Sequence, residues 1–375
     1  MTILSDRSAR AKVPAAGQPR EGVPSAQAAP EVRRDIRSRS VDDRLRAPGA
    51  AISALALVWI TFEFVLPWSG WVGFALCWLG TFLVLITALA ALSSPRPVVI
   101  DRLMAATVTA GAAVVGLALA SAVLYTLVRA STSLLHLSFF TTDMSGVRPT
   151  DPLTRGGILH AIVGSAIEIG IAIAITVPLG IGTAVYMVEV GGRVAQVVRT
   201  VVEAMTALPS IVAGLFIYTV LIIAIGFNRS GFAAAMAISV MILPIIARGS
   251  DIALRIVPQG LREASLALGS SQWQTVWRVV LPTARPGLTT AVILGIARGV
   301  GETSPVLLTS GASTFLAFDP TSGAMNSLPL YVFSAVRSGQ SLYILRGFGA
   351  ASVLLLLVLV LFVIMRRLAR QQASR

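Results

Sequence analysis

Eight long apolar segments, separated by polar connections, follow a polar beginning of the chain. They cover about 50–67, 71–92, 103–129, 157–188, 205–226, 231–248, 287–310 and 343–365. Most of them reach the roughly 20 residues that a helix needs to cross a hydrocarbon layer of about 30 Å. The pattern therefore predicts an all-α, polytopic transmembrane helix bundle. Its first two segments are close enough in sequence to form a helical hairpin.

Both ends of the chain are polar, and the first is long. Residues 1–48 are rich in Arg, Pro, Ala, Ser and Gln and lack apolar periodicity, which is typical of a disordered tail. A signal peptide is not expected, because this charged stretch is far longer than an n-region. We expect four parts: the tail 1–48, a transmembrane hairpin 49–95, a main transmembrane domain 100–368 and a short tail 369–375.

Arginine predicts how the bundle is oriented. The connections on one side of the expected membrane hold most of the arginines: Arg96, Arg102, Arg193, Arg199, Arg248, Arg255, Arg262, Arg278 and Arg285. Cytoplasmic loops carry such an excess. We therefore expect a multi-pass membrane protein with both termini in the cytoplasm.

Composition agrees with a lipid environment. Hydrophobic residues make up 55% of the chain and charged residues 13%, whereas soluble domains carry about 25% charged residues. The net charge of +13 could indicate nucleic acid. However, the arginines cluster beside the apolar segments, so we expect no nucleic-acid partner.

Single cysteine and lysine residues exclude two kinds of site. Cys77 is the only cysteine, so neither an intrachain disulfide nor a cysteine metal cluster can form. Lys12, in the polar tail, is the only lysine. A Walker A loop needs a lysine against the phosphates of ATP. This chain therefore cannot be the ATPase of its own system, and its energy comes from a partner or from a gradient.

The polar connection 249–285 predicts two short amphipathic helices. Pro258 can open the first helix, and Gly269 can end it. A second helix follows through Trp273, and Pro282 is expected to end it. By this pattern alone the pair is a docking element or an interfacial pair of helices.

Particular residues in this connection resemble the EAA loop of the permeases of ATP-binding-cassette (ABC) importers. The match consists of Glu263, Ala264, Gly269, Leu281 and Pro282, with Ser265 and Val279 as mild departures. The resemblance implies a coupling loop that docks on a separate ATPase subunit. Glu263 and Ala264 would lie on the coupling helix, and Gly269 would form its turn.

Two charges fall inside the seventh segment. Arg298 lies eleven residues beyond Gly287, or about 16 Å along a helix, near the expected midplane. Exposing such a charge to lipid costs on the order of 3 kcal/mol or more. Arg298 and Glu302, one turn apart, should therefore face the bundle interior or a water-filled path. They could form an internal ion pair that fixes helix packing, or an anion relay in which the guanidinium matches phosphate oxygens.

One further carboxyl lies deep in the fourth segment. Glu168 could be a second cavity group, or it could pair with a neighbouring helix.

Several stretches resemble phosphate permeases, and specifically the PstA-type subunit. They are Arg298 to Thr303 with Pro305, Leu208 to Leu215, Pro178 to Gly182 with Tyr186 and Glu189, and Ser327 to Tyr331. The resemblance covers about 100–368. Val306 departs from the family's leucine, and Glu168 stands where the family is normally apolar.

This resemblance implies a type I ABC importer permease fold, with a six-helix core and the first two segments as an extension. Arg298, Glu302 and Thr303 would line the substrate path. The implied partners are a PstC-type second permease, two ATPase subunits that hydrolyse the ATP, and an extracytoplasmic phosphate-binding protein. This chain would bind no cofactor.

Other functions compete with phosphate import. An importer of the same build could carry sulfate, molybdate or phosphonate, and a gradient-driven secondary transporter is also an all-helical membrane protein. A membrane-embedded enzyme is disfavoured, since His136 and His160 are the only histidines and no nucleophile motif accompanies them. We therefore expect a non-catalytic transport subunit.

Overall fold

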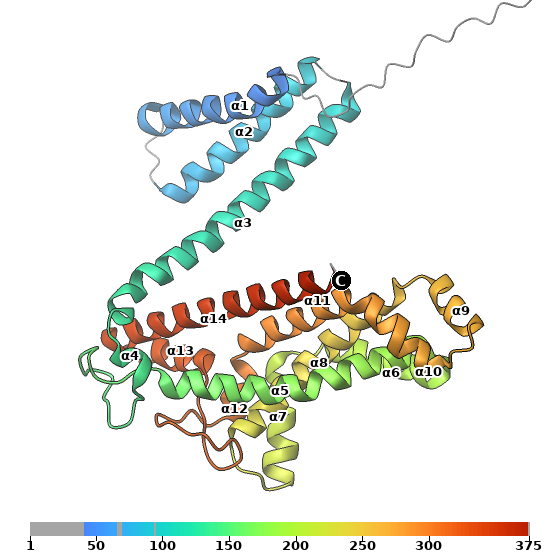
Figure 1. Ribbon diagram of the computed structural model, residues 1–375. Coiled ribbons are helices and arrows are strands. Elements are labelled where there is room, and N and C mark those ends of the chain that lie inside the picture. The colour runs from blue at the N-terminus through green and yellow to red at the C-terminus, as the bar shows by residue number, and fades with distance from the viewer. Residues whose placement is uncertain (1–40, 66–69, 94, 374–375) are drawn as a thin grey trace, which may run out of the picture. The chain divides into compact units, whose positions relative to one another are not determined.

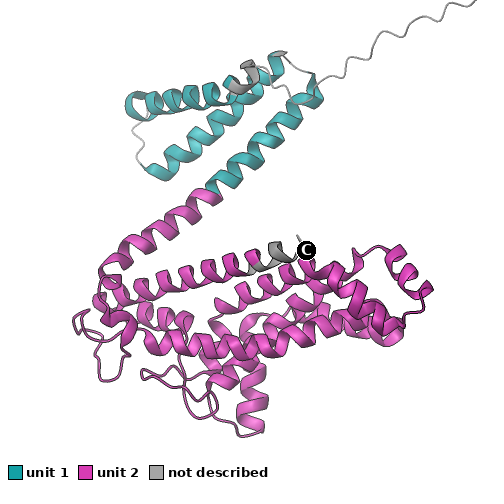
Figure 2. Ribbon diagram, viewed as in Figure 1, with its two compact units in different colours: residues 1–114 teal, residues 115–375 magenta. Residues whose placement is uncertain are grey.

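The computed structural model describes residues 41–65, 70–93 and 95–373, and its regular elements there are helices (Figure 1). Within these ranges, seven helices are long and apolar enough to cross a membrane, and a bent pair of helices could supply an eighth crossing. The prediction of an all-α, polytopic bundle is therefore confirmed. The described residues form two compact units, which divide between Val114 and Val115 (Figure 2).

The first unit contains a helical hairpin. Helix α1 (Val41–Ile60) continues into the π-helix η1 (Thr61–Val65) and pairs with α2 (Trp71–Ser93). The indole of Trp78 donates a hydrogen bond of 3.0 Å to the carbonyl of Ala51. Most of the predicted tail lies outside the described residues. Helix α1 begins at Val41, within the last residues of the predicted tail.

Helix α3 (Arg96–Leu134) contains the division between the two units. Its 39 residues form one continuous helix that is longer at both ends than the predicted segment 103–129. The compact units therefore divide inside a helix, whereas the sequence suggested a boundary in the connection at 95–100.

The core of the second unit is formed by three helices: α5 (Leu159–Val185), α8 (Gly231–Arg255) and α11 (Leu281–Val300). Ile242 and Ile246 of α8 are fully buried at its centre. Helices α13 (Leu328–Arg337) and α14 (Ser341–Ala373) pack together, and α14 also contacts α11 (Figure 1). Other elements of this unit include α4 (Ser138–Thr141), η2 (Tyr186–Val190), α6 (Gly192–Thr206), α9 (Gln259–Ala267) and α10 (Gln272–Thr275).

Small residues bring α11 close to α8. Gly287, Ala291, Gly295 and Gly299 recur every four residues along α11. A Cβ atom at Gly295 would lie 2.7 Å from Cγ1 of Ile246, and one at Gly299 would overlap Cδ1 of Ile242. Such spacing lets two membrane helices approach without side chains between them.

The predicted fifth segment is not one straight crossing. Helix α6 ends at Thr206, and α7 (Ser210–Ile217) with the π-helix η3 (Tyr218–Ala224) starts anew at an angle of 109°. Pro209 stands at the start of α7. Its ring disfavours a helical conformation for the residue before it. Therefore Pro209 begins a helix instead of kinking one.

The predicted seventh segment is wrong at both ends. One continuous helix runs over Gln272–Val300, through α10, the π-helix η4 (Val276–Val280) and α11. Pro282 does not end the second loop helix, because the chain stays helical through η4 and Pro282 stands in the first turn of α11. The hydroxyl of Thr283 also donates a hydrogen bond of 2.6 Å to the carbonyl of Val279. The helix ends at Val300, and α12 (Ser304–Thr309) follows after a break.

Candidate functional site

An ion pair stands at the break between α11 and α12. Nε of Arg298 lies 3.0 Å from Oε1 of Glu302. The chain turns tightly at this point, since the N–H groups of Gly301 and Glu302 donate to the carbonyls of Arg298 and Gly299. This turn keeps the two side chains one turn apart although the helix has ended. The sequence-based expectation that they lie on the same face is met by this geometry.

The two charges differ in exposure. The side chain of Glu302 is 9% exposed, whereas that of Arg298 is 55% exposed in this single chain. We expected both charges to face the bundle interior or a water-filled path. Glu302 lies inside this bundle, whereas Arg298 does not, so only the water-filled path remains for Arg298. The next residue, Gly299, packs against α8, and successive helical residues point about 100° apart. Arg298 is consequently directed away from the core.

The level of Arg298 follows from its neighbour. Gly299 meets Ile242 and Ile238, which lie about halfway along the spanning helix α8. The sequence analysis counted the depth of Arg298 in the membrane from Gly287. The helix already begins at Gln272, so the count started from the wrong residue. Packing nevertheless places the ion pair near the middle of the span.

Two of the motif stretches meet beside this break. A Cβ atom at Gly214 in α7 would lie 2.5 Å from Cα of Pro305 in α12. Glycine is therefore required where α7 crosses α12. Thr303 is the residue from which α12 begins, and its side chain is half-buried. Gly214 thus fixes the position of the segment that carries Glu302 and Thr303.

Glu168 does not line an open cavity. Its side chain is fully buried, and Oε1 lies 2.8 Å from Oγ of Ser310. The same hydroxyl lies 2.6 Å from the carbonyl oxygen of Met325. A hydroxyl has one proton to donate. If that proton goes to Met325, the carboxyl of Glu168 must donate to Ser310 and is therefore neutral. Glu168 thus ties α5 to the segment between α12 and α13.

Replacing Glu168 with glutamine tests this neutral carboxyl. Glu168→Gln retains both a donor and an acceptor, so we expect the thermal stability of the purified protein to stay close to that of the unchanged protein. Glu168→Ala removes the partner of Ser310 and leaves a cavity, and we expect a loss of about 2–4 kcal/mol. A Gln variant as unstable as the Ala variant would contradict a neutral carboxyl.

The predicted coupling helix is α9, and most of its side chains are free of the fold. Glu263 and Ala264 are exposed, as are Leu266 and, just beyond α9, Leu268, the last at 88%. Ser265 is buried and shares a hydrogen bond of 2.9 Å with Thr275 of α10. The departure of Ser265 from the family's alanine thus has a structural role. The contact attaches α9 to the helix that follows it.

Gly269 forms the turn after α9, as expected. Its φ of +85° lies in the left-handed region that favours glycine, and no atom lies within 4 Å of a Cβ built there. Leu281 and Pro282 lie apart from this turn, half-buried within the continuous helix that runs to Val300. The structure therefore brings Glu263, Ala264 and Gly269 together on one surface but not Leu281 and Pro282.

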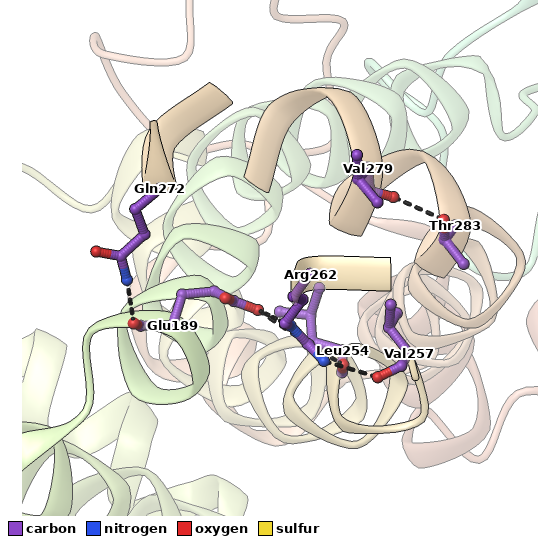
Figure 3. A network of polar contacts seen from close by, with 7 residues as sticks. All are labelled: Glu189, Leu254, Val257, Arg262, Gln272, Val279 and Thr283. Carbon is purple, nitrogen blue, oxygen red and sulfur yellow. Dashed lines mark hydrogen bonds and ion pairs between the residues drawn. The ribbon is translucent and has the colours of Figure 1, made fainter. Parts of the chain in front are cut away.

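Arg262 and Glu189 form a second ion pair that the sequence did not single out as a site. Nη2 of Arg262 lies 3.0 Å from Oε1 of Glu189 (Figure 3). Both side chains are largely buried. A signal existed in the sequence, since Arg262 directly precedes Glu263 and Glu189 belongs to one of the motif stretches. Their separation of 73 residues hid the pairing.

At the end of the second unit opposite α9 (Figure 1), residues from later in the chain hold the loop that follows α4. Burial opposes ionisation of Asp143, but hydrogen bonds from the N–H groups of Ser145 and Leu316 outweigh it and hold the pKa of Asp143 below its ordinary value. The guanidinium of Arg346 is fully buried, and its Nη2 donates to the carbonyls of Asp151, Pro152 and Arg155. This end of the unit is therefore firmly organised.

Comparison with known proteins relates the chain to curated transport proteins. It is 41% identical over 221 residues to the phosphate transport system permease protein PstA 1 of Mycobacterium tuberculosis (strain ATCC 25618 / H37Rv), which covers 59% of this chain and 71% of that protein. It is 33% identical over 246 residues to the corresponding PstA protein of Pasteurella multocida, covering 65% of this chain and 85% of that protein.

A likeness to a solved structure was also found. A chain of the MetNI methionine ABC transporter in an inward-facing conformation is matched with a TM-score of 0.45 and 21% identity, covering 58% of this chain and 94% of that chain.

The family follows from a model that matches residues 176–374. This range contains both ion pairs, the broken helix and α9. The chain belongs to the family of inner membrane components of binding-protein-dependent transport systems.

Proposed function

We propose that this chain is the permease subunit of an ABC importer that carries inorganic phosphate across the bacterial inner membrane. The names of the relatives support phosphate, and so does the chemistry of the ion pair. A guanidinium offers a planar fork of N–H donors that matches phosphate oxygens and stays charged at any relevant pH. Glu302, held against Arg298, keeps the guanidinium oriented between substrates and opposes anion binding that is too tight.

The exposure of Arg298 is the observation that carries this proposal. A charged side chain at this level of the bundle is too costly to leave in lipid. Its 55% exposed surface must therefore meet water or another polypeptide. A second permease subunit of the PstC type would cover it, and the phosphate path would run between the two chains along Arg298, Glu302 and Thr303.

The exposed face of α9 supports the coupling to ATP. Leu268 is 88% exposed, Leu266 is also exposed although it lies in a polar connection, and Glu263 lies beside them. Apolar patches of this kind mark interaction sites. We assign this face to the cleft of an ATPase subunit in the cytoplasm. Two such subunits would hydrolyse the ATP, while a phosphate-binding protein would deliver substrate at the opposite, extracytoplasmic end.

Uptake by proteoliposomes tests this function. Vesicles that contain this chain, a PstC-type permease and the ATPase subunits should accumulate labelled phosphate when ATP is inside and the loaded binding protein is outside. Unlabelled phosphate should compete, whereas sulfate, molybdate and phosphonate should not. Uptake that needs no ATP but collapses with an ionophore would instead identify a secondary transporter. Selective competition by sulfate or molybdate would identify another oxyanion importer.

A further inference from the structure

Three polar side chains connect helix ends where α9 meets the bundle (Figure 3). Arg262 projects from α9 toward Glu189 in η2, the continuation of α5. Its Nε and Nη2 donate to Oε1 of Glu189 at 3.2 and 3.0 Å. On the other side, the amide of Gln272 donates a hydrogen bond of 2.6 Å to the backbone carbonyl of Glu189. Gln272 is the first residue of the helix that leads to Arg298.

The same guanidinium also binds the end of α8. Nη1 of Arg262 donates to the carbonyl of Val257 at 2.7 Å, and Nη2 donates to that of Leu254 at 2.9 Å. The side chains of Arg262 and Glu189 are only 12% and 9% exposed. Arg262 of α9, Glu189 beyond α5, the end of α8 and the first residue of α10 therefore meet around one buried ion pair.

Few other polar contacts attach α9 to the bundle. Within the described part of the chain, Ser265 supplies the other side-chain hydrogen bond from α9, and it reaches α10 alone. Arg262 is thus the residue that links α9 directly to α5 and α8. If a force acts on the exposed face of α9, this buried pair lies on the route to the spanning helices.

We propose that Arg262, Glu189 and Gln272 form a joint that makes α9, α5 and the helix Gln272–Val300 move as one body during transport. This inference rests on the proposed function, in which an ATPase displaces α9. The three are positioning residues, since they lie far along the chain from Arg298 and act through the helices that they join. The helix that begins at Gln272 carries Arg298, so motion of α9 changes the position of the guanidinium in the path.

A double-mutant cycle tests the joint in the reconstituted complex. The measured quantity is the amount of phosphate taken up per ATP hydrolysed, which does not depend on how much complex assembles. Arg262→Gln and Glu189→Gln should each lower this ratio about tenfold, within the range of typical coupling between sites. The double variant should be no worse than the worse single variant, because both changes break the same contact. Arg262→Lys should restore part of the ratio.

Arg255 offers a matched control at the same end of the unit. It also pairs with a carboxylate, Asp251, at 3.1 Å, but its side chain is 51% exposed. Arg255→Gln should leave the ratio unchanged. A ratio that is unchanged in Arg262→Gln and Glu189→Gln, or losses that multiply in the double variant, would overturn the joint. If the unchanged complex shows no ATP-driven phosphate uptake, the proposed function fails, and the joint fails with it.

Discussion

Phosphate uptake by the reconstituted complex should fall at least about a hundred-fold when Arg298 is replaced by alanine. The proposed contact supplies two charge-assisted hydrogen bonds, each contributing about 1.5–3 kcal/mol. A loss of about 1.4 kcal/mol corresponds to a tenfold change. The substitution also leaves the 9%-exposed carboxylate of Glu302 without its partner, and an unpaired negative charge repels an anion. The measurement is initial uptake of labelled phosphate at saturating ATP.

Two further variants separate the role of charge from that of geometry. Arg298→Lys keeps the charge but loses the planar fork, so uptake should fall less than with alanine. Arg285→Ala removes an exposed arginine from the same helix, and it should leave uptake near that of the unchanged complex. Co-purification with the other subunits reports on assembly. Normal uptake by an assembled Arg298→Ala complex would reject the relay.

The spans were predictable from the sequence because lipid imposes a simple requirement on it. A crossing helix must satisfy its backbone internally and present apolar side chains over about 20 residues. This requirement located α5, α8 and α14 to within a few residues at most ends. The prediction missed the polar ends of some helices: α8 continues to Arg255, and α1 already begins at Val41. Hydropathy does not detect a helix where it continues into polar residues.

Breaks in the helices were harder to predict, because they depend on packing between distant residues. Pro178 and Pro244 remain inside helices, whereas Pro209 and Pro305 begin new ones. The four look alike in the sequence. The position of Pro305 is set by its close contact with Gly214, which only the folded chain brings together.

The two ion pairs differ in how far the sequence could reveal them. Arg298 and Glu302 are four residues apart, so helical spacing alone suggested their contact. Spacing could not predict that Arg298 points away from the core, because it does not show which face of the helix packs on α8. Arg262 and Glu189 are distant in sequence, and a pattern in one segment gives no information about such a pair.

Replacing Gly269 with valine should disconnect the permease from its ATPase. The φ of +85° at this position costs a residue with a Cβ about 1–2 kcal/mol, and a β-branched residue is an outlier there. No atom stands within 4 Å of the added Cβ, so the change acts on the backbone alone. We expect the turn after α9 to shift, which moves Leu268 and Glu263 out of register with the ATPase cleft. Co-purification of the ATPase should drop about tenfold, and uptake should fall with it.

Gly260 provides the control, since a Cβ atom there also meets nothing within 4 Å and its φ is not positive. It lies in α9 itself. Gly260→Ala adds one methyl group to the same helix without straining the backbone, so it should retain docking, whereas the matched Gly269→Ala should still disturb the turn. Glu263→Arg should weaken docking by reversing the charge on the exposed face while the turn remains intact. If both Gly269→Val and Glu263→Arg leave co-purification and uptake undiminished, α9 is not the element that docks on the ATPase.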